Sequence, residues 1–248
     1  MAELPEIFKL TGQMRDTLRG KTIQSVTLLQ KKCTNIPPDE FQKRVAGAMV
    51  KDVRNKGKWI ITELNNGENI LLSLGMGADV LYFENEKDQA EKYQVKAVFS
   101  DGSGYTARFW WFGKFLLVTD DELESEPNTK DIAIDPFDKR FTPEYFSSLL
   151  KGKKTQIKSF LLEQKNVSGI GNMYMHDILF KARLHPQKKI SDMIEEEIRL
   201  LYESIIEILN LSLEKGTFAY ESDFFGQKGG LSCRRTVFNC LGSKTLMS

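Results

Sequence analysis

The sequence predicts an α+β protein with one N-terminal helix, an antiparallel β-sandwich and a helical domain after it. Short runs that alternate apolar and polar residues, with turn signals between them, fill the first half of the chain and are typical of antiparallel strands. In the second half, apolar residues recur every three or four positions, as in amphipathic helices. The 248 residues suffice for one large domain or two modest ones. We divide them into a sandwich at 1–118, a connector at 119–141, a helical domain at 142–223 and a tail at 224–248.

The first expected element is a helix that ends before Gly20. Pro5 suits the first turn, where its missing N–H is no loss, and Glu6 complements the positive end of the helix dipole. One apolar stripe at helical spacing follows, formed by Ile7, Leu10, Met14 and Leu18. The stripe predicts a helix that docks on a sheet.

Eight short runs with the character of strands come next. They lie at 22–28, 53–55, 58–64, 69–74, 80–84, 94–100, 104–109 and 115–118. The pairs Asn66–Gly67 and Asp101–Gly102 are hairpin-turn signals between consecutive runs. Many short strands after a single helix favour an antiparallel sandwich.

The second half begins with an acidic, proline-containing connector. Thr142 and Pro143 then form an N-cap and a first helical position. A long amphipathic helix that ends at Lys215–Gly216 is predicted by the spacing of Ile194, Ile198, Leu201, Ile205, Ile208 and Leu209.

Composition limits the setting of the protein. The chain has no apolar run of about 18 residues and no basic N-terminal region followed by an apolar core, so neither a membrane span nor a secretory signal is expected. Its three cysteines contain no CxxC pair and predict no disulfide framework. We expect a cytoplasmic, nucleoid-associated monomer without a cofactor or a membrane partner.

Residues 164–186 form the segment around which the chain is organised. Gly169 and Gly171 interrupt two stretches of helical spacing, and His185–Pro186 ends the second. Two glycines one residue apart let the backbone approach a phosphate and leave N–H groups free at a helix N-terminus, where an anion is favoured. The Asn172 side chain can donate to the same anion.

The charge around this segment indicates a polyanionic partner. Residues 151–190, Lys154 among them, carry nine cations and two acids, whereas residues 191–223 carry nine acids and two cations. The whole chain has a formal net charge of only +1, so the sorting predicts one basic face. The alternative is a solvated helical hairpin whose lysines are incidental.

The same segment resembles the helix-two-turn-helix element of the Fpg/Nei superfamily, the formamidopyrimidine-DNA glycosylases and endonuclease VIII proteins. The family pattern is close to GxGNxYxxExLFxAxxHP, and Asp177 stands here where the family has Glu. The matching residues are Gly169, Gly171, Asn172, Tyr174, Leu179, Phe180, Ala182, His185 and Pro186. The resemblance implies a helix-two-turn-helix domain and duplex DNA as the partner.

The N-terminus resembles the family start, Met-Pro-Glu-Leu-Pro-Glu, except that Ala2 replaces the proline. In the family, the amine at this position attacks the sugar C1′ and displaces the damaged base, and Glu3 matches the acid/base carboxylate. Ala2, once Met1 is removed, would present a primary amine that can also form an imine. Lys58 matches a hairpin lysine that assists at the sugar and phosphate; without the resemblance, an ordinary exposed lysine is an equal alternative.

Two further loops resemble parts of the family that act on DNA. Met76, in Leu74-Gly75-Met76-Gly77, matches a methionine that fills the gap left by an extruded base; by itself it would be taken for core filling. Phe112–Gly113 is kept, but Trp111 replaces the arginine that faces the opposite base. Tryptophan offers stacking with little sequence code, which puts opposite-base selectivity in doubt. The alternative is that Trp110 and Trp111 are both core residues, but two adjacent residues of a strand point in opposite directions, so at most one is easily buried there.

The tail resembles the family's zinc β-hairpin, but only Cys233 and Cys240 remain of four cysteines, so we predict a hairpin without zinc. Arg235 matches a residue that binds a phosphate beside the flipped nucleotide. A frayed basic tail is the alternative.

Two functions follow from these expectations. The first is a DNA-binding protein that recognises damaged, distorted or branched DNA and whose glycosylase and AP-lyase activity is weak or lost. The second is an active base-excision glycosylase and AP lyase that uses the Ala2 amine. The missing proline, arginine and zinc ligands favour the first. A nucleotide-binding enzyme is disfavoured, because no strand precedes the glycines and no P-loop lysine follows them.

Overall fold

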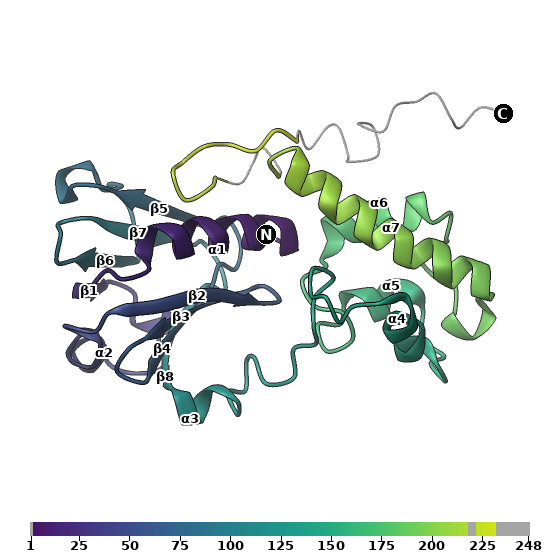
Figure 1. Ribbon diagram of the computed structural model, residues 1–248, viewed down its shortest axis with the longest axis horizontal. Helices are drawn as coiled ribbons and strands as arrows, with labels where there is room; N and C mark the ends of the chain where they lie inside the picture. The colour runs from purple at the N-terminus through teal and green to yellow at the C-terminus, as the bar shows by residue number, and fades with distance from the viewer. Residues whose placement is uncertain (1, 218–221, 232–248) are drawn as a thin grey trace. The chain divides into compact units, whose positions relative to one another are not determined.

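The computed structural model describes residues 2–217 and 222–231, which form two compact units. The first unit contains Ala2, Glu6–Lys130 and residues 222–228. The second contains Glu3–Pro5, residues 131–217 and residues 229–231. Each unit has its own hydrophobic core, and Figure 1 shows strands in the first and mainly helices in the second. The α+β prediction is confirmed.

The first unit is a sandwich of two four-stranded antiparallel sheets. One sheet has the order β1 (Ile23–Leu28), β6 (Val95–Phe99), β7 (Gly104–Arg108) and β5 (Asp79–Phe83). The other has the order β2 (Val50–Lys56), β3 (Trp59–Leu64), β4 (Glu68–Ser73) and β8 (Lys114–Thr119). All eight predicted runs are strands. Their inward residues share one core, because period-2 alternation sends every second side chain to the same face.

The N-terminal helix α1 spans Leu4–Leu18, and its predicted stripe is buried in the core of the first unit. A second helix, α2 (Pro38–Val45), was not predicted. Its signals are present, because Pro38 opens it, acids occupy its first turn, and Phe41 and Val45 bury one face four residues apart. Two short 3-10 helices also belong to this unit, η1 (Lys31–Cys33) and η2 (Glu86–Asp88).

The predicted connector contains structure of its own. Thr119 starts α3 (Asp120–Leu123) with a capping box, in which its hydroxyl accepts from the Glu122 N–H and the Glu122 carboxylate accepts from the Thr119 N–H. The chain passes from the first unit to the second after Lys130.

The second unit is built from α4 (Pro143–Leu150), α5 (Ile157–Leu162), α6 (Asn172–Lys181), η3 (Ile190–Asp192) and α7 (Glu195–Glu214). Thr142 caps α4 by accepting from the Tyr145 N–H at 3.2 Å, as predicted. Tyr174 of α6 is fully buried, and its hydroxyl hydrogen-bonds Ser212 of α7. No helix among the described residues is long and apolar enough to cross a membrane.

The segment 222–228 is fastened to the first unit. The Asp223 carboxylate accepts from Gln13 Nε2 and pairs with Lys9 Nζ, each at 3.0 Å. The Phe224 ring is fully buried in the core, and its carbonyl accepts from the Tyr82 N–H of β5 at 2.8 Å. Burial alone would raise the pKa of Asp223, but the hydrogen bonds from Gln13 and Lys9 hold it below its usual value.

Candidate functional site

The carboxylate of Glu3 lies at the N-terminus of α6, within the second unit. Its Oε2 accepts from the Gly171 N–H at 2.7 Å and the Tyr174 N–H at 3.3 Å, and its Oε1 accepts from the Met173 N–H at 2.9 Å. Glu3 is only 3% exposed. The first N–H groups of a helix have no partner inside the helix and carry the positive end of its dipole, so a carboxylate fits there.

Gly169 holds the chain in place for this contact. Its backbone φ is +86°, a conformation that favours glycine, and its carbonyl accepts from the Leu4 N–H at 2.9 Å. A Cβ on Gly169 would lie 2.7 Å from Leu4 Cβ, so no larger residue fits without a shift. The glycine therefore permits the close approach that puts Glu3 against α6.

The expectation that these N–H groups are free for a phosphate is wrong for three of them. The groups of Gly171, Met173 and Tyr174 are taken by a carboxylate of the same chain. Gly171 also has an ordinary φ of −132°. The side chain of Asn172, the first residue of α6, is exposed and remains available to an anion.

Part of the predicted basic face is a surface on the second unit around the start of α5. Lys153 and Lys154 lie in the loop before α5 and are exposed. The segment that contains Lys189 lies beside this loop. Gln156 and Lys189 form an isolated antiparallel β-bridge, and the Ile190 N–H donates to the Thr155 carbonyl at 3.0 Å. Among the ion pairs of the described residues, none involves Lys153, Lys154 or Lys189. We call these three residues the basic surface.

The basic face is smaller than the count of charges predicted. Lys181 pairs with Glu207 at 2.7 Å, and Lys188 pairs with Glu197 at 2.5 Å. Arg183 lines a cavity of about 420 Å³ together with Glu203 and Glu207 of α7. The acidic helix that follows in sequence thus partly neutralises the basic segment.

Two predicted site residues belong to the first unit. Ala2 is 5% exposed and packs in the core of that unit. Lys58 is half-buried and is the second residue of the two-residue loop between β2 and β3, whose register closes at Lys56 and Trp59. Gly57, the first loop residue, has φ +56°, which this tight hairpin requires.

Four large apolar side chains stand out from the first unit on two adjoining loops. Trp110 is 70% exposed, Trp111 64%, Phe112 79% and Met76 47%. We call these four residues the aromatic cluster. Neither tryptophan is buried, because the chain leaves β7 at Arg108 and residues 109–113 form a loop rather than a strand. The alternatives that placed these tryptophans or Met76 in the core are therefore wrong.

The two loops are held together by their backbones. The Met76 N–H donates to the Trp111 carbonyl at 2.9 Å, and the Trp110 N–H donates to the Met76 carbonyl at 3.0 Å. Gly75 has φ +59°, and a Cβ there would lie 2.1 Å from the Trp111 oxygen. Phe112 adopts φ +60°, which is strained for a bulky residue. The exposed rings thus have a defined backbone beneath them.

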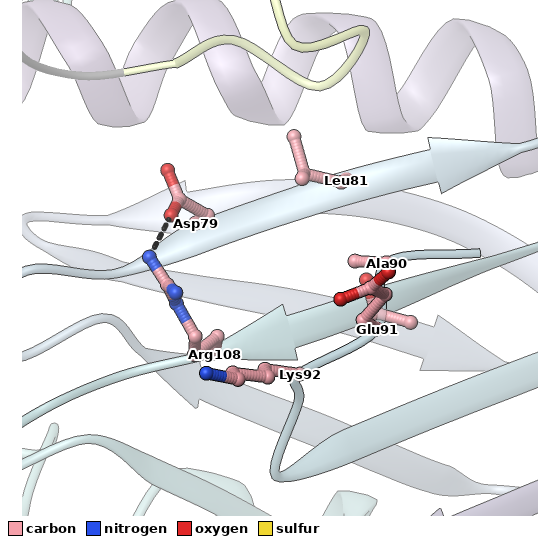
Figure 2. A pocket seen from close by; sticks show the side chains of 7 residues that line it. Asp79, Leu81, Ala90, Glu91, Lys92 and Arg108 are labelled. Atoms are coloured by element: carbon pink, nitrogen blue, oxygen red, sulfur yellow. Dashed lines mark hydrogen bonds and ion pairs between the residues drawn. The ribbon is translucent and has the colours of Figure 1, made fainter.

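An ion pair joins the strands that lead into these loops. Asp79 of β5 and Arg108 of β7 face each other in the sheet, and Arg108 Nη2 lies 2.8 Å from Asp79 Oδ2 (Figure 2). Asp79 follows Gly77 by two residues, and Arg108 precedes Trp110 by two. The two residues also line a cavity of about 410 Å³ with Glu91, Lys92 and Thr106, and none of the predicted site residues lies in it.

Trp110 and Gly75 are the residues that the sequence interpretation missed. Gly75 was read only as part of the glycine-rich loop that carries Met76, and Trp110 only as the neighbour of Trp111 in a pair that a core would bury. The doubled tryptophan between glycine-rich loops was the available signal. Arg235, Cys233 and Cys240 lie outside the described residues, as does the predicted hairpin after Leu231.

Two family models match the chain. The model for the formamidopyrimidine-DNA glycosylase N-terminal domain matches residues 1–111. The model for the formamidopyrimidine-DNA glycosylase H2TH domain matches residues 132–222. Together they cover the sandwich strands up to β7 and the helical part of the second unit.

Individual proteins match over nearly the whole chain. The formamidopyrimidine-DNA glycosylase of Brevibacillus brevis is 32% identical over 92% of this chain and 83% of its own length. That of an Exiguobacterium species is 30% identical over 98% of this chain and 90% of its own. A structure of Lactococcus lactis Fpg with DNA that contains an abasic site has a TM-score of 0.81 and 26% identity, covering 92% of this chain and 84% of its own. Another, with DNA that contains an oxidized pyrimidine, has a TM-score of 0.81 and 27% identity over the same shares.

Proposed function

The chain belongs to the formamidopyrimidine-DNA glycosylase family, and from this we propose that it is a base-excision DNA glycosylase and AP lyase that acts on damaged duplex DNA. The observation that carries the proposal is the buried Glu3 carboxylate on three N–H groups of α6. Burying a carboxylate costs free energy unless hydrogen bonds satisfy it. This chain supplies those hydrogen bonds to Glu3 even though the residue before it is Ala2 and not the family's proline.

The proposed chemistry uses the Ala2 α-amine after removal of Met1. The amine nitrogen attacks the sugar C1′, the bond from C1′ to the base breaks, and the base leaves with a proton. The ring then opens to an imine, and loss of a C2′ proton breaks the C3′–O bond by β-elimination. An α-amine has a pKa of about 7.7–8.0, so a useful fraction is unprotonated at neutral pH.

Glu3 is proposed to exchange protons with the sugar during these steps. A carboxyl group accepts hydrogen bonds when ionised and donates one when protonated, so it can serve both to take up and to give a proton. Lys58 is proposed to support the reaction from the β2–β3 loop, at the sugar and its phosphate.

Duplex DNA is the proposed partner, and the basic surface and Asn172 are proposed to bind its phosphates. Lys153, Lys154 and Lys189 gather on one side of the second unit without an ion pair in the described part of the chain. Binding of this kind releases counterions and weakens steeply with salt.

A second function has one observation in its favour, the alanine at position 2. Alanine lacks the ring that fixes φ in a proline, and misplacing a nucleophile by about 1 Å can lower a rate about 100-fold. The protein would then recognise damaged, distorted or branched DNA with weak or lost chemistry. The comparisons, all with glycosylases of this family, support the enzymatic function better.

The test is borohydride trapping on a duplex that contains an abasic site. Borohydride reduces an imine to a stable amine and so fixes the protein to the DNA, and peptide mapping locates the bond. We expect an adduct at the Ala2 nitrogen. It should be absent from a form whose N-terminus is extended by two residues, because the Ala2 nitrogen then stays in a peptide bond.

The matched control is Ala2→Pro, which restores the secondary amine and leaves the rest of the chain unchanged. Trapping by both proteins supports the enzyme. Trapping by Ala2→Pro alone, with equal DNA binding by both, would overturn the enzymatic function and leave the recognition protein.

A further inference from the structure

We infer that Gln164 is a positioning residue for the proposed reaction and acts on Glu3 through the backbone of residues 169–171. The inference rests on the proposed function and deepens it, because it adds a residue on which the proton exchange by Glu3 depends. Gln164 is the second residue after α5, and it belongs with Glu3 to the second unit. In this role its side chain contacts neither the DNA nor the reacting atoms.

The Gln164 side chain binds three backbone groups. Its Oε1 accepts from the Gly169 N–H at 2.9 Å, and its Nε2 donates to the carbonyls of Ile170 at 2.9 Å and Leu162 at 3.1 Å. A primary amide has one acceptor oxygen and two donor hydrogens, so both ends of the group are used. The amide therefore ties the end of α5 to the turn that precedes α6.

The contact with Ile170 bears directly on Glu3. The Ile170 carbonyl and the Gly171 N–H belong to one planar trans peptide group, in which the two point in opposite directions. Gln164 holds the carbonyl, and Glu3 Oε2 accepts from the N–H at 2.7 Å. The two side chains thus hold one peptide group from opposite sides. Loss of the Gln164 contact would free this group to rotate and carry the donor away from the carboxylate.

The contact with Gly169 restricts a second link to the N-terminal segment. The Gly169 carbonyl accepts from the N–H of Leu4, the residue directly after Glu3, and Gln164 holds the N–H of the same glycine. Residues 169–171 are buried, where a backbone group without a partner costs free energy. Gln164 therefore satisfies two buried groups of the turn and fixes the backbone that holds Glu3.

Two other polar side chains of the same loop do not share this role. Ser168 is fully buried, and its Oγ has no hydrogen-bond partner among the described residues. Asn166 is half-buried, as Gln164 is, and its Nδ2 donates to the Phe160 carbonyl of α5 at 3.2 Å. Asn166 thus offers a matched control, since it is a nearby amide with a backbone partner outside residues 169–171.

The experiment compares Gln164→Met with Asn166→Leu in the full chain. Both substitutions nearly keep the size of the side chain and remove its amide. The first readout is the single-turnover rate of strand cleavage at an abasic site in duplex DNA. The second is the affinity for a duplex that carries a tetrahydrofuran abasic analogue, which has no C1′ leaving group and so does not react. The third is the Gly171 amide resonance in the ¹⁵N–¹H correlation spectrum of the DNA-free protein.

Gln164→Met should lower the cleavage rate about tenfold and change the affinity less than about threefold, because a misplaced acid or base slows the reaction without removing phosphate contacts. The Gly171 amide proton should move upfield, because its hydrogen bond to the carboxylate weakens. Asn166→Leu should leave all three readouts unchanged. A merely structural role of Gln164 would lower stability without separating the rate from the affinity.

Gln164→Glu is a second variant of nearly the same shape. Its carboxylate keeps an acceptor for the Gly169 N–H but has no donor for the Ile170 carbonyl when ionised. It should therefore show the same separation of rate from affinity at neutral pH, also if Gln164→Met does not fold.

Failure is also specific. If the wild type cleaves, an unchanged rate or an unmoved Gly171 resonance in the folded Gln164 variants would overturn this inference and leave the proposed function standing. A parallel fall of rate and affinity would overturn it as well, because Gln164 would then act in DNA binding, and so would an equal loss of rate in Asn166→Leu. Absence of cleavage by the wild type would overturn the proposed function and this inference together.

Discussion

Glu3 and the aromatic cluster differ in almost every physical respect. Glu3 is buried and is held by backbone N–H groups, which every residue except proline supplies. The cluster is exposed, and its function would depend on the identity of its side chains. The backbone beneath the cluster is nevertheless as constrained as that at Glu3, by Gly75 and by Phe112 at positive φ.

This difference separates a residue that the fold requires, Glu3, from residues of the aromatic cluster, which the fold does not need for its core. Removing Glu3 takes the acceptor from three N–H donors, two of them buried and one partly buried, so the helical unit itself depends on the carboxylate. Trp111, in contrast, is 64% exposed, and its ring centroid lies 6.5 Å from that of Phe112. Replacing so exposed a side chain should therefore cost the fold less stability than removing Glu3.

The largest effect is expected for Glu3→Ala. Uncompensated burial of the Gly171, Met173 and Tyr174 N–H groups should lower the free energy of unfolding of the second unit by about 3 kcal/mol. Urea unfolding followed by circular dichroism measures it. Glu3→Gln keeps one acceptor oxygen and should lose less than Glu3→Ala. Equal stability of both variants and the wild type would show that the carboxylate does not hold the unit.

The next effect is expected for Gly75→Ala. The added Cβ would meet the Trp111 oxygen at 2.1 Å and the Gly113 nitrogen at 2.6 Å, so the two loops must separate. Affinity for abasic-analogue DNA should fall about tenfold while β5 and β7 stay folded. Gly102→Ala is the matched control, because Gly102 also has positive φ (+83°) but nothing within 4 Å of an added Cβ. It should lose about 1 kcal/mol of stability and no affinity. Equal affinity of the Gly75 and Gly102 variants would mean that the loop geometry is irrelevant to binding.

A smaller effect is expected for Lys154→Ala. Loss of one phosphate contact should weaken binding a few-fold and reduce the slope of log affinity against log salt by about 0.9. Trp111→Ala should weaken binding more and leave that slope unchanged, because stacking releases no counterion. Lys87→Ala, at an exposed lysine of η2, is the control for a generic change of charge. A slope that does not distinguish Lys154→Ala from Lys87→Ala would remove Lys154 from the interface.

Sequence patterns predicted the sandwich well because strand alternation is a local signal. All eight runs became strands, and the Thr142 cap followed the same logic. The predicted stripe of α7 is buried from Leu201 to Leu209, but Ile194 precedes the helix and is exposed. The α2 helix was missed because eight residues carry barely two turns of periodicity. The proline at its start, the acids in its first turn and the basic residues in its last turn indicate a helix more clearly than its apolar spacing does.

The candidate site was less predictable because its contacts are not local. Glu3 and Gly171 are separated by 168 residues, and no spacing rule foretells that a carboxylate occupies that helix end instead of a phosphate. Lys181 and Lys188 were counted toward a basic face although α7 neutralises them. Trp110 and Trp111 were read with strand periodicity, although β7 ends at Arg108 and residues 109–113 form a loop. Each error came from contacts between different segments of the chain or from the point at which a strand ends.

The smallest effect concerns acid and is expected for Asp101, a half-exposed carboxylate that contrasts with the buried Glu3. Asp101 lies in the turn between β6 and β7, where hydrogen bonds from Lys21 and Ser103 lower its pKa from 3.8 to about 2. The lowered pKa stabilises the fold fully above pH 3.8, and this stabilisation is lost as the pH falls toward 2. Asp101 is half exposed, so its contribution should stay below about 1 kcal/mol. Asp101→Asn should therefore be slightly less stable than the wild type at pH 6 and approach it below pH 2, as urea unfolding at both values would measure. A difference that persists below pH 2 would show that the turn is stabilised by the shape of Asp101 and not by its charge.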